Sequence, residues 1–250
     1  MKKSLALLAV LGCFSQSSMA ATTFTMANLA VGGVAAAQTS FRAFSEDFGA
    51  AFSYKPVTPA AALGITGFDI GVEVSGTDVS KSSAAWKTLT GTDSPGTLPI
   101  PKVTIAKGLP FGIDISAFYT AVPTTDVKLI GAALSYAILE GGTIEPALTV
   151  RAAMTKLSGI NEFSFNTKSL DISFSKGFIG FTPYIGVGQV WVDSSTTNAT
   201  LTTLGLTAET FTQSKAFVGF NINLGLPNFA IEADSTGGIS TVSAKLGLRW

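Results

Sequence analysis

The chemistry open to this chain is limited first by what it lacks, because none of its 250 residues is histidine and Cys13 is its one cysteine. Histidine is the usual general base, cysteine is the usual thiol nucleophile, and both are common ligands of transition metals. Two pairs of carboxylates remain, Asp69 with Glu73 and Glu232 with Asp234, and each pair shares one face of an expected strand. A catalytic site in this chain would have to be built from such carboxylates.

We favour a structural role for these carboxylates, because charges of both signs that face into a narrow barrel neutralise one another. Nine residues are expected to form this network in the lumen: Asp69, Glu73, Asp114, Arg151, Asp171, Glu232, Asp234, Lys245 and Arg249.

The spacing of these charges also predicts how the barrel closes. If the first strand pairs with the last so that Ile70 lies beside Leu248, two acids meet two bases, Asp69 opposite Arg249 and Glu73 opposite Lys245. A shift of two residues, which barrel shear permits, would leave the same charges diagonal to one another.

The N-terminal 20 residues are typical of a signal peptide. Lys2 and Lys3 precede an apolar run over residues 5–11, and residues 18–20 form a small-x-small cleavage site. Residues 10–13 also match a lipoprotein box, so acylation of Cys13 remains an alternative. Without the two leader lysines the chain has 14 basic residues against 16 acidic ones, which gives no indication of nucleic-acid binding.

Residues 21–65 are expected to form a separate N-terminal segment. Phe41, Phe44, Phe48 and Phe52 recur at spacings of three, four and four, which predicts an amphipathic helix from about residue 38 to 52 that could plug a barrel. Residues 47–54 also alternate between apolar and polar side chains, so a strand there is an alternative. Pro56 and Pro59 would end either element.

From residue 66 to 250 the sequence alternates with period two and predicts about ten antiparallel strands. Counted back from Trp250, the turns near residues 225–228, 177–183, 141–146 and 107–110 fall at one end and are short. The two long polar segments, 77–99 and 193–210, fall at the other end. Short turns at the periplasmic end and longer loops outside are typical of outer-membrane barrels. Counting residues 47–54 and a partner near Phe24 would make twelve strands.

The composition supports the same all-β fold. The chain is 46% hydrophobic and only 13% charged, yet no stretch after the leader approaches the roughly 18 uninterrupted apolar residues of a membrane helix. Hydrophobicity that is spread thinly over many strands is typical of an antiparallel transmembrane β-barrel, in which lipid covers one face of each strand.

The last strand alternates up to the final residue, with Leu246, Leu248 and Trp250 on its apolar face. This pattern resembles the C-terminal signal of Gram-negative outer-membrane β-barrels, whose assembly machinery reads such a strand. The resemblance implies an integral outer-membrane protein whose partners are outer-membrane lipid and the barrel assembly machinery. A terminal Trp replaces the Phe that most of that family carry.

Four segments extend this resemblance to uncharacterised proteobacterial outer-membrane barrel proteins: 44–49 (FSEDFG), 67–71 (GFDIG), 107–112 (KGLPFG) and 245–248 (KLGL). The resemblance brings no known activity, and the outer-membrane barrel enzymes that it suggests rely on a catalytic histidine that this chain lacks. We therefore expect no enzyme, no metal and no cofactor. The expected function is a small pore or conduit for a small or hydrophobic solute; the alternative is a closed structural or surface-interaction barrel that works through its outer loops.

Overall fold

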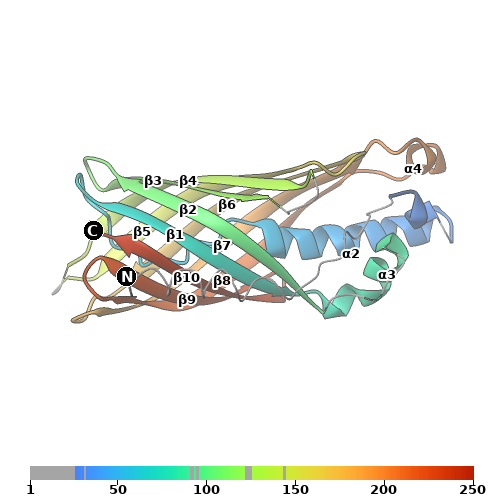
Figure 1. The fold of residues 1–250 in the computed structure, drawn as a ribbon. Coiled ribbons are helices and arrows are strands. Elements are labelled where there is room, and N and C mark those ends of the chain that lie inside the picture. Colours follow the sequence, from blue (N-terminus) through green and yellow to red (C-terminus); the bar gives the residue numbers. More distant parts are fainter. Residues whose placement is uncertain (1–25, 31, 91–92, 94–95, 122–125, 143–144) are drawn as a thin grey trace.

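In the computed structural model ten antiparallel strands close into a single barrel (Figure 1). The structure describes residues 26–250 except 31, 91–92, 94–95, 122–125 and 143–144. The expected signal peptide and the strand near Phe24 therefore lie outside the described residues. The strands are β1 (Phe68–Asp78), β2 (Thr97–Gly108), β3 (Ile113–Ala121), β4 (Lys128–Glu140), β5 (Ala147–Ser158), β6 (Phe163–Ser175), β7 (Phe181–Thr196), β8 (Glu209–Asn223), β9 (Pro227–Thr236) and β10 (Ile239–Arg249).

The strands follow one another around the barrel in chain order, and β1 closes it against β10. The ten-strand prediction is confirmed, and the twelve-strand alternative is wrong. The C-terminus lies at the end of the barrel that carries the short turns, which we call the turn end (Figure 1). The opposite, helix end carries all three α-helices of the described chain.

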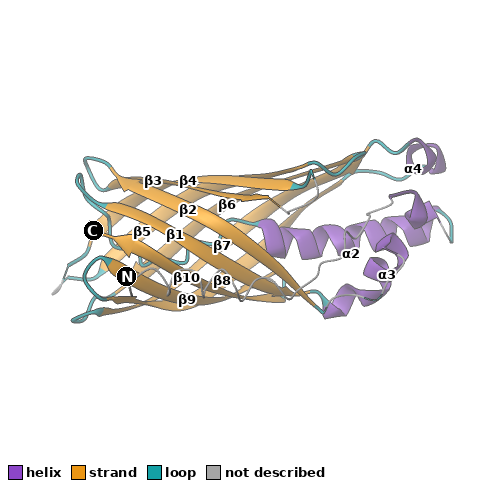
Figure 2. Cartoon of the chain, viewed as in Figure 1, coloured by secondary structure: helices purple, strands orange, loops and turns teal. Residues whose placement is uncertain are grey.

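The predicted N-terminal helix is present and is longer than expected. A short 3-10 helix, η2 (Met26–Ala30), precedes α2 (Val34–Phe52), which enters the barrel from the helix end (Figure 2). Phe41, Phe44 and Phe48 are buried on one stripe, so the helical period decides the conformation and the strand alternative for residues 47–54 is wrong. The extra first turn is rich in alanine, a strong helix former.

The two long polar segments at the helix end are shorter than the sequence predicts, because strands extend into them and helices fill them. The first contains η3 (Ser80–Ser82) and α3 (Ser83–Thr90), and the second contains α4 (Ala199–Leu204). Strand β2 begins at Thr97 although Pro99 and Pro101 follow, which are poor strand residues. Over this part β2 pairs with β1 alone, because its pairing with β3 starts at Val103, so β2 has a free edge that tolerates the missing N–H groups.

Side chains alternate between the lumen and the outer face along most of the barrel wall. In β4, for example, Leu129, Ala133 and Ser135 are buried toward the lumen, while Ile130 and Leu134 are more than half exposed on the outer face. Among the described residues, no helix has the length and apolarity needed to cross a membrane. The lumen has two regions, an apolar one around α2 and a charged one between α2 and the turn end.

Candidate functional site: the occupied lumen

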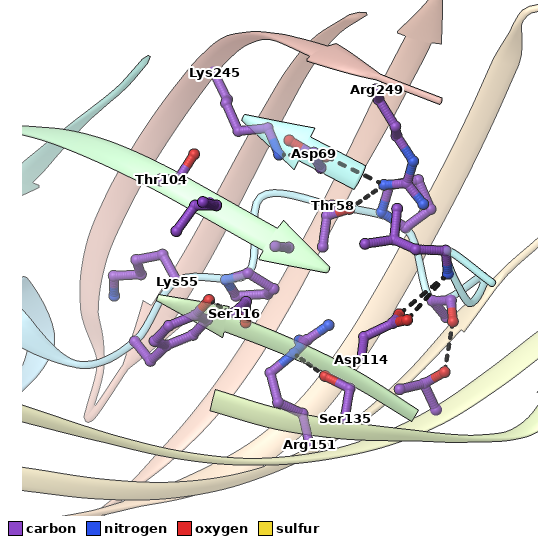
Figure 3. Close-up of a pocket in the computed structure, with 18 of the residues that line it drawn as sticks. Lys55, Thr58, Asp69, Thr104, Asp114, Ser116, Ser135, Arg151, Lys245 and Arg249 are labelled. Carbon is purple, nitrogen blue, oxygen red and sulfur yellow. Dashed lines mark hydrogen bonds and ion pairs between the residues drawn. The ribbon is translucent and has the colours of Figure 1, made fainter. Parts of the chain in front are cut away.

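The chain that follows α2 lies inside the barrel and is the centre of the charged region. We call residues 54–63 the strap; six of its ten residues are buried, and the other four are partly buried. Figure 3 shows the strap surrounded by side chains from the wall, with Lys55 and Thr58 on the strap itself. The sequence contains no periodic signal here, and Pro56 and Pro59 exclude a regular element.

The first part of the strap is held by two buried lysines. Lys55 Nζ lies 2.8 Å from Asp234 Oδ1 and also donates to the carbonyl oxygen of Ala50 at 2.7 Å. Lys215 Nζ donates to the carbonyl oxygen of Tyr54 at 2.8 Å and pairs with Asp171 at 3.3 Å. The side chains of both ion pairs are completely inaccessible to solvent. The strap and the strands β6, β8 and β9 therefore share one buried network.

The rest of the strap is held through its backbone. The N–H of Val57 donates to Glu232 Oε2 at 3.0 Å, and that of Ala60 donates to Ser175 Oγ at 3.1 Å. The N–H of Leu63 donates to both carboxylate oxygens of Asp114 at 3.2 Å. An extended segment has no internal hydrogen bonds, so these wall side chains supply the partners that its buried backbone requires.

Val57 has a φ of 40°, which is rare for a β-branched residue. Such a conformation costs of order 1 to 3 kcal/mol and persists only where the surroundings determine it. Here the side chain is fully buried and the N–H is bound by Glu232. The strained residue indicates that the wall dictates the path of the strap.

The register predicted for barrel closure is confirmed: Ile70 lies beside Leu248, Asp69 beside Arg249, and Glu73 beside Lys245. The prediction that Glu73 and Lys245 form a direct ion pair is wrong.

Lys245 Nζ reaches diagonally to Asp69 Oδ2 at 2.9 Å, and Arg249 Nη1 lies 3.5 Å from the same oxygen (Figure 3). Glu73 instead pairs with Lys102 of β2 at 2.7 Å, because β1 has a neighbour on each side and that lysine lies directly opposite it.

The other predicted lumen residues also face inward. Asp171 pairs with Lys215, and Arg151 Nε donates to Ser135 Oγ at 3.1 Å. Arg249 contacts the strap at the side chain of Thr58 and the carbonyl oxygen of Ala61.

Sequence reasoning missed three lysines of this network, Lys55, Lys102 and Lys215. The alternation of the strands would have placed Lys102 and Lys215 on the inner face, since Val103 and Ala216 beside them face outward. No signal was available for Lys55, which lies in the irregular strap.

The apolar region of the lumen contains the predicted plug residues. Phe41, Phe44, Phe48 and Phe52 are all buried, and their rings contact Phe163 and Phe165 of β6. Trp86 of α3 packs against Phe44, with ring centroids 5.2 Å apart, and its indole N–H donates to Asp47 Oδ2 at 2.6 Å. Burial raises the pKa of Asp47 to about 6, and the hydrogen bonds from Trp86 and Ser82 partly oppose that shift. These contacts join α2 to the cap at the helix end, which is formed by η2, α3 and α4.

Little space remains in the charged region. A cavity of about 50 Å³ lies between the strap and the wall, lined by residues that include Asp69, Asp114, Arg151 and Arg249. In the part of the chain that the structure describes, no group of three or more cysteine, aspartate or glutamate side chains is arranged to hold a metal ion. The arrangement holds a chain segment in place, and the cavity beside it has room for a few water molecules.

No family model matches the chain, and a search of curated proteins finds no match. Among solved structures, the chain is similar to the N-terminal β-barrel domain of Pseudomonas aeruginosa OprF, with 12% identity and a TM-score of 0.37 over 73% of this chain and 97% of that one. The chain is also similar to a loop-deletion mutant of OmpT, an outer membrane protein of Vibrio cholerae, with 10% identity and a TM-score of 0.32 over 61% of this chain and 54% of that one. Its similarity to Neisserial surface protein A has 10% identity and a TM-score of 0.29 over 73% of this chain and 94% of that one. These scores are too low to carry an argument about function.

Proposed function

We propose that this chain is an integral outer-membrane barrel whose lumen is closed by its own N-terminal segment, and that it acts through the cap at its helix end. Support for membrane insertion comes from the outer face of the wall. Large apolar side chains are exposed there on every strand except β9, among them Val103, Leu134, Ile185 and Val242, each more than half exposed. Lipid is the solvent that such a surface requires.

Aromatic residues at the turn end support the same proposal. Phe111 and Trp250 are more than half exposed, and the ring of Trp250 stacks on Phe68 with centroids 5.1 Å apart. Aromatic side chains favour the boundary between hydrocarbon and water, and a girdle of them is typical of outer-membrane barrels. The turn end would then lie at the periplasmic surface, and the cap outside the cell.

The observation that carries the closed state is the strap. One ion pair without solvent access, Lys55 with Asp234, and several hydrogen bonds attach it to β3, β6, β8, β9 and β10. Displacing it would leave buried charges without partners, which costs several kcal/mol for each pair broken. These contacts therefore favour a closed barrel over an open pore.

Planar-bilayer recording tests this proposal. The full-length mature protein should give no ion-conducting steps, whereas Lys55→Glu, which places a second negative charge against Asp234, should release the strap and produce them. The matched control is Lys87→Glu in the exposed Lys87–Asp93 pair of the cap, which should remain closed. Stable conductance by the wild-type protein would contradict the closed barrel.

A gated conduit is the second candidate, and the polar lining of the lumen favours it. The turn-end half of the lumen carries charges from β1, β2, β6, β8, β9 and β10, and such a lining suits a water-filled path once the strap has moved. This candidate predicts conductance by the wild-type protein under some condition of voltage or pH, in the same recordings.

A further inference from the structure

Three exposed lysines lie close together on the outer wall. Lys128 of β4, Lys156 of β5 and Lys168 of β6 are all exposed on the outward face of their strands. No ion pair or side-chain hydrogen bond of these three lysines is found among the described residues. A lysine on the lipid face costs about 2 to 4 kcal/mol at the membrane centre and much less near the interface, so three of them together call for an anionic partner there.

Register places the three lysines on one diagonal. Lys156 lies two residues from the partner of Lys128 and two residues from the partner of Lys168. Diagonal neighbours of this kind are within reach of long side chains. On the next strand, Asp193 lies diagonal to Lys168, but its carboxylate accepts a hydrogen bond from Thr210 Oγ1 at 3.2 Å. The patch therefore has three positive charges against one negative charge.

An apolar groove of about 710 Å³ begins at this patch and runs across the wall from β6 to β2. Three outward-facing alanines, Ala117, Ala132 and Ala152, form its floor, and bulkier side chains border it. One row of paired residues crosses the groove: Ile105, Ala117, Ala132, Met154 and Lys168. At about 4.8 Å between strands, this row spans roughly 19 Å.

The groove also descends toward the turn end. Lys168 lies seven residues before the end of β6, whereas Ile105 lies three residues before the end of β2. The staggered register of a tilted barrel produces this slope. The arrangement therefore combines a cationic patch, which runs from the helix end to the middle of β6, with an apolar channel. The channel leads from this patch to Lys107 near the turn end, whose Nζ donates to the carbonyl oxygens of Ile65 and Gly67.

We propose that the groove and the three lysines form a binding site for a phosphorylated glycolipid of the outer leaflet. One acyl chain would lie over the alanine floor, and phosphate groups would bind Lys168, Lys156 and Lys128, since ammonium groups form charge-assisted hydrogen bonds with phosphate. A ligand with more than one phosphate fits a patch that spreads over three strands. The inference rests on the proposed insertion in the outer membrane with the cap outside the cell.

The test is titration of the detergent-solubilised full-length mature protein with diphosphoryl lipid A, with phosphatidylglycerol as the competing anionic lipid. Lys156→Gln/Lys168→Gln removes two charges, and its matched control, Lys81→Gln/Lys87→Gln, removes two from the cap. Ala132→Phe fills the floor of the groove, and its matched control, Ala233→Phe, makes the same change on the outward face of β9.

We expect lipid A to bind the wild-type protein, and both test variants to bind it roughly tenfold or more weakly, with both controls unchanged. Equal weakening in the controls, unchanged binding in either test variant, or equal binding of phosphatidylglycerol would overturn the proposal. Heat-modifiable mobility on unboiled gels and recovery in the outer-membrane fraction are measured on the same preparations. A protein that inserts normally but fails to bind lipid A refutes the site alone, whereas loss of insertion refutes the proposed function.

Discussion

Lys55 is the residue on which the closed lumen depends most directly, because its ammonium group has no access to water and pairs with Asp234 on β9. A buried pair gives little net stability when it is intact, but loss of one partner leaves the other charge buried and unpaired. The contribution of Lys55 is therefore visible only when it is changed alone.

We expect Lys55→Met to lower the free energy of unfolding by about 3 to 5 kcal/mol. Lys87→Met is the control, because Lys87 is exposed in its pair with Asp93, and surface pairs contribute about 0 to 1 kcal/mol. Urea unfolding of the protein in lipid vesicles, followed by tryptophan fluorescence, measures both. Equal losses for the two variants would show that the strap is not held by this pair.

The charges that close the barrel permit a second test at this scale. Because Lys245 contacts Asp69 and does not contact Glu73, a double-mutant cycle on Asp69 and Lys245 should show a coupling energy, of the 0.5 to 3 kcal/mol seen for residues in contact. The cycle on Glu73 and Lys245 should be much closer to additive, since Glu73 pairs with Lys102. A larger coupling energy for Glu73 and Lys245 than for Asp69 and Lys245 would instead support the directly opposed pair that the sequence predicts.

At the scale of elements, α2 links the interior of the barrel to the cap. Its apolar stripe packs on β6, and Asp47, on the same helix, accepts hydrogen bonds from Trp86 and Ser82 in the first outer loop. The helix therefore connects the cap directly to the strap that follows it.

Asp47 predicts how the cap responds to pH. Its pKa is raised from 3.8 to about 6, so the folded cap binds a proton that the unfolded chain has already released between these values. The stability from this group is present below about pH 4 and is lost as the pH rises through about 6. Hydrogen exchange of the α3 amides should accordingly be slower at pH 5 than at pH 7 after correction for the intrinsic rate. Asp47→Asn should remove most of that difference; a difference that persists in this variant would exclude Asp47 as its source.

At the scale of the whole molecule, the outward face of β10 ends with Leu246, Leu248 and Trp250, all exposed on the side proposed to face lipid. Deletion of Trp250 removes the stacked ring that joins β10 to β1 at the turn end, together with the proposed assembly signal. We expect the variant to lose heat-modifiable mobility and to accumulate outside the outer membrane. Arg249→Lys, which keeps the terminal aromatic residue, is the control. Normal assembly without Trp250 would argue against the signal.

Orientation is a separate property of the whole molecule. An epitope inserted after Asn161, in the exposed loop between β5 and β6, should be labelled on intact cells. One inserted after Ile179, which is almost fully exposed between β6 and β7, should be labelled only after the outer membrane is opened. The opposite pattern would invert the proposed topology.

The sequence by itself determined the features that depend on a local period. Side chains of a strand alternate with period two and those of a helix with period 3.6, so the ten strands, their inner and outer faces and α2 could all be predicted. The closure register was predicted from the positions of the charges, and a shift by one residue was excluded because it would send Asp69 and Glu73 to the outer face. A shift of two residues remained open until the structure showed the pairing.

Only the tertiary structure decided the occupant of the lumen and the pairing of its charges. The strap has no period, and Lys55 meets a partner 179 residues away, which no local pattern encodes. Each inward charge has neighbours on two strands, so proximity in three dimensions selects Lys102 for Glu73 and Asp69 for Lys245. The prolines of β2 obscured its first half for the same reason, because whether a missing N–H matters depends on a neighbouring strand that the local sequence does not specify.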